Sequence, residues 1–167
     1  MADDHPGVSI TEVAVAGPHL ETVRELLQEY LRSEAMKLCA PGYDLELAML
    51  PGDYAPPAGC LWLAQLGGVA AGCVALRRLG ATRCEMKRLY VRAAFRGAGL
   101  AGILVERVIE RARELGYQEL YLDTLPDMRA ARLMYEMLGF RACPPYLPEP
   151  TPGAECLVLD LAGLEGR

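Results

Sequence analysis

A glycine-rich segment between a predicted strand and a predicted helix is the feature that most constrains the fold of this chain. Residues 84–91 predict a strand, and residues 100–115 predict a helix whose apolar side chains recur at helical spacing. Glycine lets a ligand approach the backbone, and the unpaired N–H groups of a helix's first turn carry partial positive charge. The segment therefore predicts a site for a phosphorylated cofactor, formed by Arg96, Gly97, Ala98, Gly99, Leu100, Ala101 and Gly102.

The elements around this segment predict a mixed α/β (α+β) chain. Residues 60–66, 69–77 and 84–91 predict three strands in a meander, because turn residues such as Gly67-Gly68 join them and no helix intervenes. Further strands are expected at residues 8–16, 119–124, 141–143 and 155–161, and helices at residues 19–32, 45–50, 100–115 and 127–139.

One β-α-β unit sets part of the topology. The predicted helix at 100–115 joins the strands at 84–91 and 119–124, so these two strands are expected to be parallel. Asp127 is the expected N-cap of the next helix. The 167 residues predict a single domain over residues 1–167, with its core at about residues 8–161.

Composition excludes several classes of function. A net charge of −5 argues against nucleic acid as a partner, and no apolar run is long enough for a membrane span. The polar residues 1–6 do not resemble a signal peptide, so a cytoplasmic location is expected. The six cysteines lack metal-site spacing and are expected to be buried apolar residues, with no bound metal. Two serines and two histidines, all near the N-terminus, argue against a Ser-His-Asp hydrolase.

A dinucleotide-binding site is the competing interpretation of the glycines. Gly97, Gly99 and Gly102 match the spacing G-x-G-x-x-G, and Asp123 follows at about the distance of the ribose-binding acid. Residues 92–96, however, separate the strand from the glycines, and a meander cannot build the parallel sheet that this site needs. The glycine segment therefore fits another phosphate-binding family better.

Two segments together resemble the GNAT (Gcn5-related N-acetyltransferase) superfamily. Residues 96–101, Arg-Gly-Ala-Gly-Leu-Ala, match its pattern Arg/Gln-x-x-Gly-x-Gly/Ala between a strand and a helix. Residues 131–140, which end in Leu-Gly-Phe, match its second conserved helix. The resemblance covers about residues 8–161 and implies a central, twisted, mixed and mostly antiparallel sheet of six to seven strands, with a parallel splayed pair and about four flanking helices.

The resemblance implies acetyl-CoA as the cosubstrate. Its pyrophosphate would contact the backbone of residues 96–102, and its pantetheine arm would pair with backbone groups of Leu89, Tyr90 and Val91. Ala131 aligns with a further cofactor contact. Many relatives have asparagine three residues before this alanine, whereas this chain has Met128, so one hydrogen bond to the cofactor is expected to be lost.

Two candidate catalytic residues follow from the same resemblance. Tyr135 matches the tyrosine that protonates the leaving thiolate, and the alternative is that its ring only packs. Glu85 lies where some relatives carry a glutamate that acts as base, directly or through water. The alternative for Glu85 is an ion pair with Lys87 or a nearby arginine, since an unpaired charge in a central strand is costly.

The sequence thus predicts an N-acetyltransferase that moves acetyl to the amine of an unidentified small molecule or peptide by direct attack in a ternary complex. The alternative is a non-catalytic acyl-CoA-binding sensor on the same fold. Residues 33–59 and 144–152 are expected to meet the acceptor, and a homodimer is compatible with this interpretation. Six side chains in these segments are candidates for a cationic amine, although solvated loop positions are the favoured explanation: Tyr43, Asp44, Glu46, Tyr54, Tyr146 and Glu149.

Overall fold

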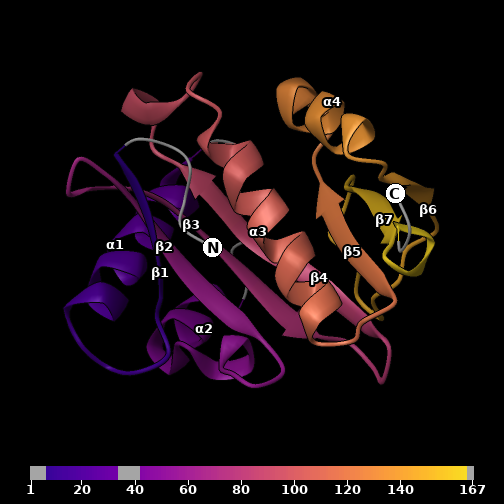
Figure 1. Cartoon of the computed structure of the whole chain (residues 1–167), viewed down its shortest axis with the longest axis horizontal. Helices are drawn as coiled ribbons and strands as arrows, with labels where there is room; N and C mark the ends of the chain where they lie inside the picture. The colour runs from indigo at the N-terminus through magenta and orange to yellow at the C-terminus, as the bar shows by residue number, and fades with distance from the viewer. Residues whose placement is uncertain (1–6, 34–41, 165–167) are drawn as a thin grey trace.

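A seven-stranded sheet runs through the computed structural model, which describes residues 7–33 and 42–164 (Figure 1). The strand order is β1-β2-β3-β4-β5-β7-β6, and every neighbouring pair is antiparallel except β4 and β5. The strands are β1 (Val8–Glu12), β2 (Cys60–Leu66), β3 (Val69–Arg78), β4 (Arg83–Val91), β5 (Glu119–Thr124), β6 (Arg141–Cys143) and β7 (Glu155–Asp160).

Helices cover both faces of this sheet, and a separate apolar core lies under each set. On one face α3 and α4 pack with the cluster that includes Leu104, Val108 and Leu120. On the other face α1 and α2 pack with the cluster that includes Leu26, Leu27 and Leu63 (Figure 1). The four α-helices of the described residues are α1 (Pro18–Arg32), α2 (Tyr43–Met49), α3 (Leu100–Glu114) and α4 (Arg129–Met137).

The observed architecture confirms the predicted fold class, including the strand meander and the parallel pair. Two local expectations were wrong. The first strand ends at Glu12 rather than at residue 16, because pairing with β2 stops there. Asp127 does not cap α4; Met128 holds the N-cap position, and no side chain caps that helix.

The parallel ladder between β4 and β5 is short, and this positions the site. Pairing covers only Arg83, Cys84 and Glu85 of β4, after which the two strands separate (Figure 1). On its other side β4 carries a bulge, since the register with β3 moves from Ala75↔Lys87 to Cys73↔Tyr90. A bulge bends its strand. The carboxyl half of β4 therefore diverges from β5. Its backbone still pairs with β3 but has no strand partner on the side that faces β5.

Arg88 sits at this bulge in an unusual conformation. Its φ is +61°, the one positive φ of a non-glycine residue in the described chain. Such a conformation costs free energy and persists where surrounding contacts fix it. The Arg88 side chain has these contacts, which are part of the polar network described below.

Candidate active site

A cavity of about 840 Å³ opens where β4 and β5 diverge. Every predicted cofactor contact except Ala98 lines it: Leu89, Tyr90, Val91, Arg96, Gly97, Gly99, Leu100, Ala101, Gly102 and Ala131. The structure thus brings three distant parts of the sequence together: the end of β4, the glycine segment before α3, and α4.

The glycine segment is open in the way that a phosphate site needs. Gly97 and Gly99 have φ of +83° and +80°, and a Cβ at either position would meet no atom within 4 Å. Gly99 is the N-cap of α3, so the free N–H groups of the first turn follow it. Arg96 is partly turned away, since its Nε donates to the Val91 carbonyl oxygen at 3.0 Å. Backbone groups therefore dominate the polar surface at this end.

Several cavity residues were not predicted from the sequence. Tyr30 comes from α1, Phe95 from the turn before α3, and Asp127, Arg129 and Met134 from the region of α4. Tyr30 looked like one more member of the apolar face of its helix, and nothing local distinguishes it. Met128, expected to replace a polar cofactor contact, does line the cavity and accepts a weak hydrogen bond from Thr124 Oγ1 at 3.9 Å.

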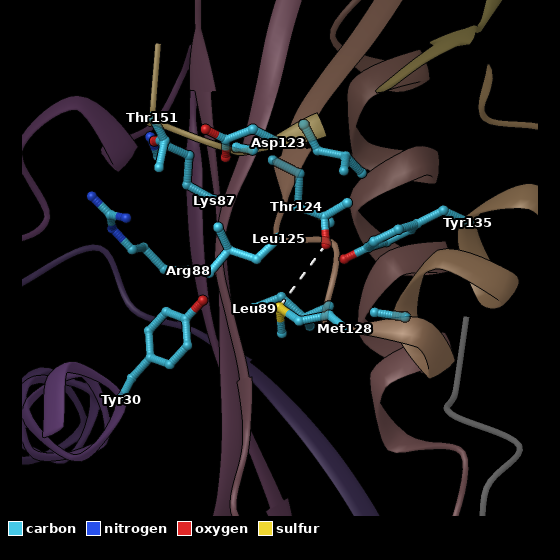
Figure 2. A pocket seen from close by; sticks show the side chains of 14 residues that line it. Tyr30, Lys87, Arg88, Leu89, Asp123, Thr124, Leu125, Met128, Tyr135 and Thr151 are labelled. Carbon is cyan, nitrogen blue, oxygen red and sulfur yellow. Dashed lines mark hydrogen bonds between the residues drawn. The ribbon is translucent and has the colours of Figure 1, made fainter. Parts of the chain in front are cut away.

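A second cavity, of about 110 Å³, adjoins the first and shares several of its lining residues. Lys87, Asp123 and Thr151 lie at one side of it, and Tyr135 lies at the other (Figure 2). The shared wall consists of Tyr30, Leu89, Met128 and Ala131. Two adjoining cavities of different size and polarity suit a reaction between two substrates.

Tyr135 of α4 lines the smaller cavity. Its ring packs edge-on against Phe140 with centroids 5.5 Å apart, and its hydroxyl points into the smaller cavity (Figure 2). Burial raises the pKa of Tyr135 above its ordinary value, and the charge of Asp123 adds to this shift. The hydroxyl therefore stays protonated at neutral pH, as a proton donor must.

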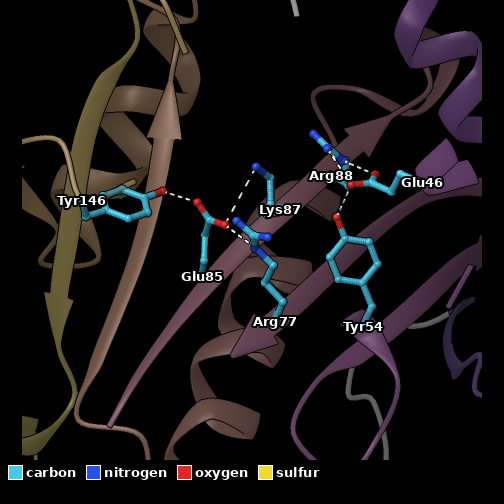
Figure 3. A network of polar contacts seen from close by, with 7 residues as sticks. All are labelled: Glu46, Tyr54, Arg77, Glu85, Lys87, Arg88 and Tyr146. Atoms are coloured by element: carbon cyan, nitrogen blue, oxygen red, sulfur yellow. Dashed lines mark hydrogen bonds and ion pairs between the residues drawn. The ribbon is translucent and has the colours of Figure 1, made fainter. Parts of the chain in front are cut away.

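Glu85 lies elsewhere. Its side chain is fully buried, it lines neither cavity, and its two oxygens are occupied. Arg77 Nε donates to Oε1 at 2.7 Å and the Tyr146 hydroxyl donates to Oε2 at 2.5 Å, while Lys87 Nζ lies 3.8 Å from Oε1 (Figure 3). These contacts are the ion pairs that formed the structural alternative for this residue.

A second group of contacts fixes the bulge in β4. Arg88 donates twice to Glu46 of α2, at 2.6 and 2.8 Å (Figure 3). Its guanidinium also lies 4.1 Å from the centre of the Tyr43 ring. Tyr54 also donates to Glu46 at 2.9 Å. Burial is the largest single influence on Glu46 and opposes its ionisation, but the hydrogen bonds and charge of Arg88, together with Tyr54 and Lys87, outweigh it, so the pKa of Glu46 is lowered.

These networks correct the expectation that Tyr43, Glu46, Tyr54 and Tyr146 are free for a cationic amine. Each contacts another part of the protein, and burial raises the pKa of all three tyrosines. Residues 34–41, part of the segment expected to meet the acceptor, lie outside the described residues, as do residues 1–6 and Cys39.

No cysteine of the described chain is an activated nucleophile. Burial raises the pKa of Cys60 and Cys73 to about 12 and shifts the pKa of Cys84, Cys143 and Cys156 in the same direction. Within residues 7–33 and 42–164, no group of three histidine, cysteine, aspartate or glutamate side chains is placed to hold a metal ion. The same ranges contain no helix that could span a membrane.

Known proteins share this architecture. A solved acetyltransferase from Streptococcus agalactiae superposes with a TM-score of 0.79 at 21% identity, covering 93% of this chain and 99% of that one. A GNAT family acetyltransferase from Elizabethkingia anophelis, solved with acetyl-CoA bound, has a TM-score of 0.66 at 22% identity and covers 93% of this chain and 99% of its own.

Sequence comparisons agree. An uncharacterized N-acetyltransferase of Schizosaccharomyces pombe is 38% identical over 86% of this chain and 89% of its own length. N-acetylaspartate synthetase of Danio rerio is 39% identical over 58% of this chain, but over only 35% of its own length. The model of the acetyltransferase (GNAT) family matches residues 20–140. The chain therefore belongs to the acetyltransferase (GNAT) family, which makes it an acyltransferase with acetyl-CoA as its cosubstrate.

Proposed function

We propose that this protein transfers acetyl from acetyl-CoA to the amine of a small acceptor, by direct attack while both substrates are bound. The observation that carries this proposal is the pair of adjoining cavities with Tyr135 in the wall of the smaller one. The larger chamber would hold the cofactor and the smaller one the acceptor. The raised pKa of every described cysteine supports direct attack, because a covalent acyl-enzyme needs an activated nucleophile.

The residues of the larger chamber fit acetyl-CoA. The open glycines before α3 suit the pyrophosphate, with Arg96 and Arg129 adding positive charge at the cavity wall. An extended arm suits the backbone of Leu89 and Val91, which lies beyond the end of the β4–β5 ladder. Bound in this way, the cosubstrate supplies the activated acetyl group and a thiol leaving group.

Tyr135 is proposed as the acid that protonates the leaving thiolate. Its hydroxyl points into the smaller cavity, and its raised pKa keeps the proton on the oxygen until the thiolate forms beside it. A thiol has an ordinary pKa well below that of this phenol, but the thiolate forms at the moment of bond breaking, when a nearby hydroxyl can donate. The packing of its ring against Phe140 would orient the group.

Glu85 is proposed as a positioning residue rather than as the base. A base must reach the amine, directly or through water, and Glu85 is fully buried with both oxygens engaged. Its contacts instead join β3, through Arg77, to the segment before β7, through Tyr146, and fix the start of the region where β4 leaves β5. Glu85 would therefore stabilise the strands that form the smaller chamber without lining it.

The competing function is a sensor that binds acetyl-CoA without turnover. The two are separated by measuring free-thiol release from acetyl-CoA with a panel of amines, amino acids and amine-bearing antibiotics, beside calorimetry of CoA binding. Amine-dependent thiol release with an acetylated product, identified by mass spectrometry, supports the transferase. Tight CoA binding without any acetylated product across the panel would identify the sensor.

A further inference from the structure

Two opposite charges face the smaller cavity from adjacent strands. Lys87 projects from β4 and Asp123 from β5, and both lie near Thr151 at the side of the cavity away from Tyr135 (Figure 2). Lys87 and Asp123 form no ion pair with each other. A cavity that holds a separated cation and anion suits a small molecule that carries both charges.

Asp123 is not neutralised by the protein. Within the described part of the chain, its carboxylate accepts no hydrogen bond and forms no ion pair, although its charge raises the pKa of Tyr135 and Tyr146. Its position in β5, opposite Cys156, keeps the side chain on the wall of the cavity. A partly buried carboxylate of this kind is a suitable partner for an incoming ammonium group.

Lys87 also has donors to spare. Glu85, the carboxylate nearest to it, already accepts from Arg77 at 2.7 Å and from Tyr146 at 2.5 Å, and Lys87 Nζ lies at 3.8 Å, beyond hydrogen-bonding distance. Arg88, the other cation that lines this cavity, already donates from two guanidinium nitrogens to Glu46. Of the two cations that line the cavity, Lys87 is therefore the one with ammonium donors available to a ligand carboxylate.

We infer that the acceptor is a free amino acid or similar small zwitterion, with its ammonium group at Asp123 and its carboxylate at Lys87. This inference rests on the proposed transferase function and names its substrate class. The volume of about 110 Å³ supports it, because a cavity of about 150 Å³ holds one benzene molecule. The cavity therefore takes the zwitterionic head of an amino acid, and a large side chain has to extend outside it.

The reaction balances with these residues. The ammonium nitrogen loses one proton to solvent, and its lone pair forms the new C–N bond as the C–S bond of the thioester breaks. Tyr135 gives a proton to the departing sulfur and recovers one from the second proton that the nitrogen loses. The products are the N-acetylated amino acid, free CoA and one released proton, with Asp123 and Lys87 unchanged.

The test compares each common amino acid with its decarboxylated amine as acceptors, by kcat/KM. The amino acid and its decarboxylated amine differ in basicity. The ratio of their kcat/KM values is therefore compared between wild type and Lys87→Met. We expect that variant to lower the preference for amino acids at least about tenfold, through KM for the amino acid, which corresponds to about 1.4 kcal/mol. Asp123→Asn should raise KM for both members of each pair.

Two controls make the outcome decisive. Lys87→Arg should retain most of the preference because the charge remains, and Arg113→Met, which removes an exposed cation of α3 outside both cavities, should leave the ratio unchanged. An unchanged ratio in Lys87→Met, or a wild-type preference for amines without a carboxylate, would overturn the inference.

Failure of catalysis itself is distinguishable. If no acceptor is acetylated, calorimetry of amino acids added to the protein–CoA complex decides the question. Binding that is weakened in Lys87→Met would support the zwitterion site while refuting the transferase function. Absence of binding by any amino acid would overturn the site as well.

Discussion

The two chambers of the site, which are the larger and the smaller cavity, differ in whether backbone groups or side chains form them. The larger one presents mainly backbone at the glycine segment before α3 and along the free half of β4, with φ near +80° at Gly97 and Gly99. The smaller one is surrounded by side chains that depend on partners far away in sequence. Arg88 and Glu46 are 42 residues apart, and Glu85 and Tyr146 are 61 apart. A backbone site is encoded locally, whereas a side-chain site is encoded by the whole fold.

This difference has a consequence for tolerance to mutation. In the larger chamber, loss of a side chain should matter less than addition of one, because the proposed cofactor site at the glycine segment depends on open space and N–H groups. In the smaller chamber, removal of one member of a network leaves a buried partner unsatisfied. The predictions below test this contrast, beginning with the largest expected effect.

Tyr135→Phe tests whether catalysis depends on one side-chain atom, the hydroxyl oxygen of Tyr135. The ring can still pack against Phe140, so we expect an intact fold and a kcat lowered by about 10²–10⁴-fold, with little change in KM for acetyl-CoA. Tyr117→Phe is the matched control, since that buried tyrosine bonds to Ala58 far from both cavities. A fall of less than about threefold, with chemistry shown to be rate-limiting, would leave Tyr135 as a packing residue.

Glu85→Gln tests the network behind the smaller chamber. We expect a loss of about 3 kcal/mol in the free energy of unfolding, the low end for removing one partner of a buried pair, because Arg77 keeps 27% of its side chain exposed. Urea melts measure this loss. The residual activity should keep the wild-type pH profile. Activity lost mainly at low pH and recovered as pH rises would instead make Glu85 the base or its relay.

Gly99→Gln tests the backbone-built chamber by adding a side chain. We expect CoA to bind at least about tenfold more weakly by calorimetry, because the new side chain occupies the cavity. Gly116→Gln is a close control: Gly116 has φ +82° at the other end of α3, and a Cβ there also meets no atom within 4 Å. Equal losses in both variants would attribute the effect to backbone strain and remove the argument for this placement.

Acid should weaken the contacts of α2 before those of the glycine segment. Because the folded pKa of Glu46 lies below the ordinary 4.5, its pairing with Arg88 stabilises the protein above that pH, and this contribution is lost as pH falls through the folded pKa. The difference in urea midpoint between wild type and Glu46→Gln should therefore be larger at about pH 7 than at about pH 3. A difference that does not change with pH would show that the pair contributes nothing through ionisation.

Arg96→Ala should have the smallest effect. Arg96 is exposed and its Nε bonds to the Val91 carbonyl, so we expect its charge to act on the pyrophosphate across solvent. We expect CoA affinity to fall by about threefold at low salt and by less at high salt, measured by calorimetry at two ionic strengths. A loss as large as that of Gly99→Gln would contradict the view that backbone groups dominate this chamber.

The same contrast explains what the sequence alone could predict. Hydrophobic period and turn residues predicted the strand meander, the parallel pair and the glycine segment, because each depends on neighbours within a few residues. The end of the first strand and the N-cap of α4 were missed. The first strand ends where its pairing with β2 ends, and the backbone conformation at Met128 places the N-cap of α4 there. Element boundaries of this kind depend on tertiary contacts.

The smaller chamber was harder to predict for a related reason. Asp123 was considered only as part of a rejected dinucleotide motif, and Lys87 only as a partner for Glu85. Nothing local indicates that Arg77 and Tyr146 satisfy Glu85 and so leave Lys87 and Asp123 facing a cavity. That assignment requires knowing which charges are already paired, and pairing is a property of the folded chain.

The short ladder between β4 and β5 gives the protein an edge in the middle of its sheet. Sheet edges usually invite other strands and so promote association between molecules. This edge faces β5 on one side, and α3 and α4 lie over one face of the sheet (Figure 1). We therefore expect a second polypeptide with full-sized side chains to be excluded. We expect a slender, unbranched chain entering lengthwise to be accepted. The gap would then select ligands by their thickness, before any atom of the acceptor is recognised.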